Sequence, residues 1–537
     1  MRKLPIAIVI MLFGYVCVPP CKAQHALDGD WIGGIDFGNT WQPINLHFKT
    51  EKDSLTGTLD LPEQGRNGLP LDRVVLESSR VRIEWQGRSG LAIYDGQLKD
   101  GAILGNFQQG EIKATFQVAH VAKVQEGIYE QYVGSYKLGA DRFVDIGRYD
   151  LLKFSDTKTG RTGSLYPLSE TSFFSGASVE IPLPVGLRVT FVKNKQGAVD
   201  SLIWSEAGAP AIRGTKLSHR QETVTFRNGD MTITGTLILP PTKGPHPAIV
   251  KVDPGYSFYP RYGFFPYFFV RQGIAFLTLN ERTLDGKAMG YSESSFEVRA
   301  RDALAGVAML KERKDINPGQ IGLHGSSLSS WVVPLAATLS PDVAFLILRV
   351  GSAIPPAENI VYEIENDLRE RDFSESDISK AKALRRLLNT TILTNTGWDT
   401  LKAEIEKAKN EKWFGYARVG WFSSVAIPPD ASALKALQDP ISYDPVPVLE
   451  RVTVPVLAYN GELDKSVNTK ESVPIMERAL RTKGNKDVTI IILRKASHDL
   501  LEAKTGYNSE YPRLRRYVSG YWDTMDTWLT KHVTVKK

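Results

Sequence analysis

Ser327 is the residue whose surroundings most clearly suggest chemistry. It lies in the run IGLHGSSLSSW at 321–331, which is typical of an apolar strand, a tight turn and the start of a helix. Such a sharp turn needs small residues two positions before and after the serine, and here they are Gly325 and Ser329. A turn of this kind presents the hydroxyl at the edge of a parallel sheet as a nucleophile, with the N–H of Leu328 directed at an oxyanion.

A nucleophilic serine needs a histidine as general base and a carboxylate that orients the histidine. Only two histidines follow Ser327 in the chain, and one of them, His532, lies in a charged C-terminal tail. His498 instead comes just after the β-forming run 488–493. A last strand would deliver this loop to the active edge of a sheet, so His498 is the predicted base.

The orienting carboxylate is expected after another apolar strand, residues 454–459. A glycine turn follows, and Asp464 stands three residues after Gly461, at a G-x-x-D spacing. Glu462 is the second choice. An aspartate in a turn can also serve only as an Asx-turn residue, and the sequence does not separate that role from a catalytic one.

These stretches together resemble the α/β-hydrolase superfamily, over most of residues 218–537. They are most similar to bacterial secreted hydrolases related to the serine aminopeptidase and dipeptidyl-peptidase-like branch, whose serine turn looks like I-G-L-x-G-H-S-x-G-G-W. The resemblance implies an α/β fold in which Ser327 is the nucleophile, Asp464 the acid and His498 the base. It implies no metal and no organic cofactor, and a small ester or a short peptide as the substrate.

The chain departs from this family at the turn after the strand 248–252. The family usually has His-Gly there, and the turn supplies the second N–H of the oxyanion hole, whereas this chain has DPGY at 253–256. Because the proline has no N–H, we expect the backbone of Gly255 or Tyr256 to act beside that of Leu328.

The first 23 residues are typical of a secretory signal peptide. Arg2 and Lys3 precede an apolar run from Ile6 to Val18, which is too short to cross a membrane, and cleavage is expected after Ala23. Both cysteines lie within this segment, so the mature chain is expected to have no disulfide. The predicted location is the periplasm or the cell exterior, without an integral membrane span.

Net charge argues against nucleic acid as a partner. The chain has 66 basic and 60 acidic residues. The signal peptide contains three basic residues and no acidic one, which leaves 63 against 60 and a net charge of +3. A basic excess this small does not indicate phosphate binding.

Two β-rich modules are expected before the hydrolase-like region, at 24–122 and 123–217, because residues alternate with a period of two. They are predicted to be antiparallel half-barrels or sandwiches. The α/β domain then covers 218–537, with a helical cap at about 355–443. The cap aromatics are expected either to line an apolar pocket or to pack the cap itself; they are Trp398, Trp413, Phe414, Trp421 and Phe422.

Three functions stay open at the level of sequence. Hydrolysis of carboxylic esters is the first, and a serine peptidase is the second. A peptidase of this kind needs an acidic anchor for the substrate's amine, for which Glu363 and Glu365 are candidates. The third is a binding protein on the same scaffold without activity, suggested by the altered serine and oxyanion turns. The oligomeric state is not predicted.

Overall fold

A computed structural model describes residues 25–38, 41–52, 54–176, 186–252, 263–288, 295–419 and 428–534. The predicted signal peptide 1–23, the oxyanion candidates Gly255 and Tyr256, and the aromatics Trp421 and Phe422 lie outside these residues. The chain forms two compact units. The first holds the residues up to Lys123, and the second runs from Val124 to Ser175 and from Leu187 onward.

The first unit contains an antiparallel sheet in the order β4-β3-β2-β1-β9-β8-β7-β6-β5. Alternation puts apolar side chains on one face of each strand; on β6, for example, Val81 and Ile83 are fully buried. The strands are β1 (Gly29–Asp36), β2 (Trp41–Glu51), β3 (Ser54–Leu61), β4 (Arg66–Pro70), β5 (Arg73–Glu77), β6 (Arg80–Gly87), β7 (Gly90–Lys99), β8 (Ala102–Gln109) and β9 (Ile112–Val121).

The second unit begins with a closed barrel, where the sequence predicts a half-barrel or a sandwich. Its first and last strands pair through Tyr136 with Lys216 and through Lys137 with Thr215, which closes the sheet. The strands are β10 (Gly134–Lys137), β11 (Phe143–Arg148), β12 (Leu152–Asp156), β13 (Thr162–Pro167), β14 (Ser172–Ser175), β15 (Leu187–Lys193), β16 (Val199–Glu206) and β17 (Ile212–Lys216).

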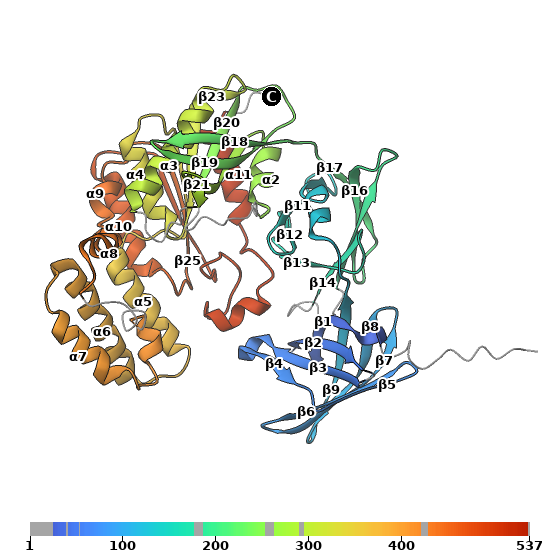
Figure 1. The fold of residues 1–537 in the computed structure, drawn as a ribbon. Helices are drawn as coiled ribbons and strands as arrows, with labels where there is room; N and C mark the ends of the chain where they lie inside the picture. The colour runs from blue at the N-terminus through green and yellow to red at the C-terminus, as the bar shows by residue number, and fades with distance from the viewer. Residues whose placement is uncertain are drawn as a thin grey trace, which may run out of the picture. The chain divides into compact units, whose positions relative to one another are not determined.

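A mainly parallel sheet follows in the order β18-β19-β21-β20-β23-β24-β25-β26, with helices against it (Figure 1). Its strands are β18 (Arg220–Asn228), β19 (Met231–Leu239), β20 (His246–Val252), β21 (Ala275–Leu284), β23 (Ile316–Ser326), β24 (Leu346–Arg349), β25 (Val456–Gly461) and β26 (Val488–Leu493), and the short β22 (Lys287–Ala288) pairs with β21. The helices are α2 (Phe265–Arg271), α3 (Phe296–Lys311), α4 (Ser329–Leu339), α10 (Thr469–Thr482) and α11 (Tyr521–His532). The carboxyl ends of the parallel strands meet at one edge, where ligands of such sheets usually bind.

The hairpin of β18 and β19 differs in its turn from the sequence prediction. Asn-Gly at 228–229 predicts a type I′ turn, which needs two central residues with positive φ. In the structure Asn228 pairs with Met231, so the two-residue loop is Gly229-Asp230. Gly229 has φ +57° and Asp230 is not among the positive-φ residues. A single positive φ at the first loop position is typical of type II′.

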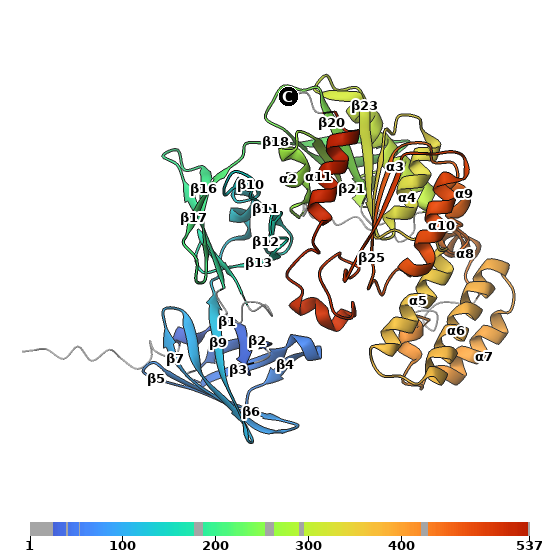
Figure 2. The same ribbon diagram turned by 180° about the vertical axis from the view of Figure 1, so that it is seen from behind.

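A helical insertion lies between β24 and β25, and Figures 1 and 2 both show its helices grouped together. It consists of α5 (Pro356–Arg369), α6 (Glu375–Thr394), α7 (Trp398–Ala408) and α8 (Ala431–Ile441), followed by the short α9 (Val446–Leu449). Ser374 caps α6 by accepting a hydrogen bond from the Asp377 N–H (3.1 Å), as its position before two acidic residues suggests. Within the described residues no helix is long and apolar enough to cross a membrane.

The barrel and the parallel sheet share one hydrophobic core. Barrel side chains such as Phe154 belong to the same buried cluster as Phe268 of α2 and Trp522 of α11. A buried ion pair also joins the two parts, between Arg271 of α2 and Asp145 of β11 (3.4 Å). The sequence-based boundary at 217/218 therefore separates two segments that bury apolar surface against each other.

The barrel also forms backbone hydrogen bonds with the long segment that follows His498. The Thr162 N–H donates to the Arg515 carbonyl (2.8 Å), and the Tyr517 N–H donates to the Gly160 carbonyl (2.8 Å). The Arg516 guanidinium donates to the Thr159 carbonyl (2.6 Å). These bonds fasten the distal part of the histidine segment to the start of β13.

Candidate active site

Ser327 occupies the turn between β23 and α4, with φ +54°. A positive φ is strained for a residue with a side chain, and strain of this kind is typical of a nucleophile held on a strand-to-helix turn. The Ser327 N–H donates to the Arg349 carbonyl on the neighbouring strand (2.9 Å). A Cβ on Gly325 would lie 2.6 Å from the Ser329 carbonyl oxygen. Glycine is therefore required two positions before the serine.

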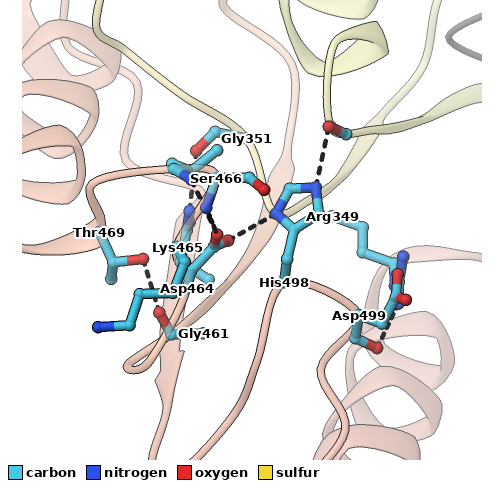
Figure 3. A network of polar contacts seen from close by, with 12 residues as sticks. Arg349, Gly351, Gly461, Asp464, Lys465, Ser466, Thr469, His498 and Asp499 are labelled. Carbon is cyan, nitrogen blue, oxygen red and sulfur yellow. Dashed lines mark hydrogen bonds and ion pairs between the residues drawn. The ribbon is translucent and has the colours of Figure 1, made fainter. Parts of the chain in front are cut away.

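The structure brings Ser327, His498 and Asp464 into one hydrogen-bonded chain. His498 Nε2 lies 3.0 Å from Ser327 Oγ, and His498 Nδ1 lies 2.8 Å from Asp464 Oδ2. Figure 3 shows His498 directed at the Asp464 carboxylate. With the Nδ1 proton donated to Asp464, the lone pair of Nε2 faces the hydroxyl proton of Ser327, which is the arrangement that general-base catalysis requires.

Asp464 is held firmly in its turn after β25. Its carboxylate is fully buried, and its second oxygen, Oδ1, accepts the N–H groups of Ser466 and Val467 (2.8 Å each). The Asx-turn role considered from the sequence is thus present, and the same carboxylate also binds His498. One oxygen fixes the turn while the other orients the imidazole.

His498 has a raised pKa. Burial by itself would lower the pKa, but the charge and hydrogen bond of Asp464 and the charge of Asp499 outweigh burial. Its imidazolium form is therefore favoured when the ring accepts a proton. A base that is stabilised in this way holds the proton within each half of an acyl transfer, between the attack and the departure of the leaving group.

Two alternatives from the sequence lie elsewhere in the structure. Glu462 accepts a hydrogen bond from the Lys495 N–H (2.8 Å), so this carboxylate supports the histidine loop. His532 pairs with Asp487 (2.8 Å) and stacks on Trp528.

Gly461 allows the histidine loop to pass close to β25. A Cβ at this position would lie 2.5 Å from the carbonyl oxygens of both Ala496 and Ser497. That distance is too short for any side chain. The glycine of the G-x-x-D pattern thus has a packing role that the spacing alone did not indicate.

The two serines that stand after Ser327, where the resembled family has two glycines, have different surroundings. Ser330 Oγ donates to the carbonyls of Arg349 (3.3 Å) and Gly325 (3.4 Å). Gly351 leaves room for this side chain, since a Cβ there would lie 2.8 Å from the Ser330 Cβ. Ser329 is fully buried, and its hydroxyl has no hydrogen-bond partner among the described residues.

Leu328 follows Ser327 and directly precedes α4. The first N–H groups of a helix have no partner within the helix and lie at the positive end of its dipole. This position suits an oxyanion donor. The other candidates, Gly255 and Tyr256, are not among the described residues, but the preceding strand β20 ends with Val252 in register with Gly325.

His324 is a core residue, as its position on the strand suggests. It is 2% exposed and lies against the rings of Phe265 and Phe269. Burial lowers its pKa to about 3, so the ring is neutral at physiological pH. It makes no hydrogen bond with the described residues and takes no part in the chain of polar contacts at Ser327.

A small pocket, open to solvent, lies beside His498. Its lining is strongly polar and includes residues of α5, the Arg418 side chain and the segment after His498. The lining residues are Glu363, Asn366, Asp367, Glu370, Arg418, Lys465, Ser466, His498, Gly506, Tyr507, Asn508 and Tyr511. Nothing in the local sequence marks Arg418, Tyr507 or Tyr511, because folding brings them together from separate segments.

A charged group of three side chains forms the insertion's side of the pocket. Arg418 donates to Glu363 (2.5 Å) and to Asp367 (2.7 Å), and each of these carboxylates is about a quarter exposed. Glu365, the other proposed amine anchor, instead pairs with Lys382 and with Arg369. Of the two predicted anchors, only Glu363 lines the pocket.

The aromatic residues of the insertion pack its own core. Trp413 is 4% exposed within that core, and Trp398 and Phe414 pack against it. None of the three lines the polar pocket. The packing role considered from the sequence is therefore the one that the described aromatics have.

Comparison with known proteins gives one curated relative and several distant structures. No protein-family model matches the chain. Esterase EstD of Thermotoga maritima is 23% identical over 326 residues, which make up 58% of this chain and 68% of that protein. Pyrococcus furiosus esterase Pf2001 is 14% identical, with 59% of this chain and 94% of that chain covered and a TM-score of 0.36. Pyrococcus horikoshii acylaminoacyl peptidase is 13% identical, with 94% and 64% covered and a TM-score of 0.38.

Both TM-scores are below 0.5, so neither structure assigns an activity to this chain. The chain's own features are more informative. A serine stands on a strained strand-to-helix turn of a mainly parallel sheet, and its hydrogen-bonded partners follow in the order aspartate, then histidine. These features resemble those of the α/β-hydrolase superfamily, and the chain is also similar to a curated esterase.

Proposed function

We propose that the protein is a serine hydrolase that cleaves carboxylic esters through an acyl-enzyme, with Ser327, His498 and Asp464 as its catalytic triad. The observation that carries this proposal is the continuous hydrogen-bonded chain from Ser327 Oγ through the imidazole to Asp464. The positive φ of Ser327 at a strand-to-helix turn is the second support, because a nucleophilic serine on such a turn typically has this conformation.

In the first half-reaction, His498 Nε2 takes the proton of Ser327 as Oγ attacks the ester carbonyl. The tetrahedral intermediate collapses when His498 gives that proton to the leaving alcohol, which leaves an acyl group on Ser327. In the second half-reaction, His498 takes a proton from water as the water oxygen attacks the acyl carbonyl. The proton then returns to Ser327 Oγ, and the carboxylic acid leaves.

The developing oxyanion is assigned to backbone N–H groups. Leu328 supplies one of them from the start of α4, and Gly255 or Tyr256 supplies the other in this proposal. Removing a single donor of this kind costs about 100- to 1,000-fold in kcat. A functional hole therefore needs the turn after β20 as well as the helix.

The polar pocket favours small polar substrates over long acyl chains. Five charged residues line it, namely Glu363, Asp367, Glu370, Arg418 and Lys465. Placing a methylene chain among partly hydrated charges gains little, because those groups lose water without gaining a partner. We therefore expect acetyl esters to be cleaved faster than octanoyl esters.

The test is an assay of the protein, of Ser327→Ala and of Ser340→Ala on p-nitrophenyl acetate, butyrate and octanoate, with fluorophosphonate labelling in parallel. Ser340 ends α4 at its far end and serves as a matched control. Turnover and labelling in the parent and in Ser340→Ala, with neither in Ser327→Ala, support the proposal. An unlabelled parent that hydrolyses none of the esters would support a binding protein on this scaffold.

A peptidase is the second candidate, because Glu363 lies in the pocket where the amine of a peptide substrate could be bound. The discriminating substrates are an aminoacyl p-nitroanilide with a free amine and its N-acetylated form. A peptidase of this kind prefers the free amine, and Glu363→Gln raises KM for that substrate alone. Equal rates on both forms would remove the amine-anchor role.

Export to the periplasm or the cell exterior is also a proposal, which rests on the sequence of residues 1–23. It is tested by expressing the full chain, separating the cellular fractions and sequencing the N-terminus of the product. A chain that begins at Gln24 in the exported fraction supports it, and an intact Met1 in the cytoplasm contradicts it.

A further inference from the structure

Arg349 is a buried arginine beside the nucleophile that the triad mechanism does not use. It ends β24, in register with Ser326 at the end of β23. Its residue exposure is only 8%. Arginine is seldom buried to this extent unless its guanidinium has specific partners.

The guanidinium of Arg349 contacts both loops that carry the reacting groups. One nitrogen, Nη1, donates to Ser326 Oγ (3.1 Å), the residue before the nucleophile. The other, Nη2, donates to the carbonyl of Asp499, the residue after the base. Figure 3 shows His498 with Asp464 on one side and the Arg349–Asp499 pair on the other.

The backbone of Arg349 adds a third contact. Its carbonyl accepts the Ser327 N–H (2.9 Å) and also the Ser330 hydroxyl (3.3 Å). The next residue, Val350, has φ +51° although it is β-branched and fully buried. Strain at such a residue persists only where the surrounding contacts impose it.

Stability alone does not explain this buried charge. The nearest carboxylate to pair with it in the described chain is Asp499, at 3.8 Å, and the Asp499 side chain is half exposed. Arg349 Nε is buried without a hydrogen-bond partner among the described residues, and the guanidinium lies over the Phe265 ring at 5.7 Å. Burying an ion with so weak a counter-charge is usually unfavourable.

We propose that Arg349 is a positioning residue that ties the nucleophile turn to the histidine loop and so fixes the approach of His498 Nε2 to Ser327 Oγ. The proposal rests on the proposed function, since it concerns the same triad. The planar fork of an arginine can donate in two directions at once, and lysine cannot reproduce this geometry. The guanidinium therefore acts as a rigid spacer between two loops that are far apart in sequence.

The charge of Arg349 gives a second, independent readout. His498 is faced by Asp464 and Asp499, which raise its pKa, and by Arg349, which lowers it. Lys465 and Tyr511 line the adjoining pocket. Removing the guanidinium charge should therefore move the acid limb of the kcat/KM profile to higher pH, whereas Arg349→Lys keeps the charge and leaves that limb in place.

The experiment compares Arg349→Met and Arg349→Lys with the parent, using rates per active site titrated with a fluorophosphonate. Arg271→Met is the matched control, because Arg271 is equally buried but pairs with Asp145 of the barrel. We expect kcat of Arg349→Met to fall about 100-fold with KM nearly unchanged, as misplacement of reacting groups by about 1 Å does. Arg349→Lys should lose less of kcat, and Arg271→Met should keep the parental kcat per titrated site.

The outcomes separate this inference from the proposed function. If the parent is labelled and active while Arg349→Met keeps its kcat per titrated site and its pH profile, the positioning role is wrong and the proposed function stands. If the parent is neither labelled nor active, the proposed function fails and the positioning role fails with it. A loss of soluble protein in Arg349→Met with unchanged kcat per titrated site also contradicts the positioning role.

Discussion

In the proposed mechanism His498 must be neutral to accept the proton of Ser327, so the pKa of His498 sets the lower pH limit of the expected activity. That pKa is raised above the ordinary value of 6.5. Activity should therefore fall as the pH drops, with the midpoint of the acid limb of kcat/KM above 6.5. The contribution of His498 to the free energy of unfolding has the opposite pH dependence. Folding favours the protonated ring, so this contribution is fully present below pH 6.5 and is lost as the pH rises through the folded-state pKa.

Asp464→Asn tests the cause of this raised pKa. The amide removes the charge that favours the imidazolium and permits the wrong tautomer, so kcat should fall about 10,000-fold. The acid limb of the remaining activity should move to lower pH. A pH–rate profile of the variant and the parent is the measurement, and an unchanged limb would assign the raised pKa to another group.

Ser329→Ala addresses the buried hydroxyl next to the nucleophile turn. A buried hydroxyl without a partner costs free energy, and alanine is also the better helix former. We expect the free energy of unfolding to rise by up to about 1 kcal/mol, measured by urea denaturation of the variant and the parent. A decrease would show that Ser329 Oγ has a partner in solution.

The grouping of Ser327, Asp464 and His498 could be predicted because each residue lies in a recognisable local pattern: a small-residue turn, a glycine turn after a strand, and a loop after a β-forming run. Arg349 and Gly351 could not be predicted in this way. Their roles depend on strands that are neighbours only in the folded sheet. The same is true of Arg418, which reaches the pocket from a segment with no motif.

At the scale of elements, the contact of β25 with the histidine loop leads to a prediction for Gly461→Ala. The added methyl group would lie 2.5 Å from two carbonyl oxygens of the loop, so the loop must move. We expect a loss of about 100-fold in kcat per titrated active site. The matched control is Gly127→Ala, whose Cβ would meet nothing within 4 Å, and equal kcat in both variants would contradict the expectation.

The strands around the site follow the sequence closely because they are continuous apolar runs, as a buried parallel sheet requires. The role of the insertion's aromatics did not follow from composition. An aromatic residue packs a core or lines a pocket with the same side chain, and only the arrangement of α6 and α7 decides between the two roles. In the structure Trp413 belongs to the buried cluster that residues of these helices help to form.

At the scale of the whole molecule, the shared core predicts how the chain responds to truncation. A chain of residues 124–537 keeps the barrel with the parallel sheet and should remain folded and active on small esters. A chain of residues 218–537 loses the barrel side chains that cover α2 and α11, so it should aggregate or lack a cooperative unfolding transition. Circular dichroism, thermal melts and ester assays check both chains, and a stable, active 218–537 chain would contradict the shared-core argument.

For a physical reason, the sequence does not predict that the barrel and the parallel sheet share one core. Period-two alternation identifies strands but not their partners, and the closing pair β10–β17 joins segments about 80 residues apart. Whether two modules share a core depends on which faces they bury, and alternation alone does not specify this.

The hydrogen bonds between the start of β13 and the segment after His498 have a consequence for how this chain can diverge. Recombination that exchanges the barrel for one from a relative would replace Gly160 and Thr162 but keep the partners Arg515 and Tyr517. Such a chimera inherits the proposed base, His498, on a segment whose anchoring was selected against a different barrel. We therefore expect a chimera to remain active only when the barrel and residues 494–520 come from the same parent protein.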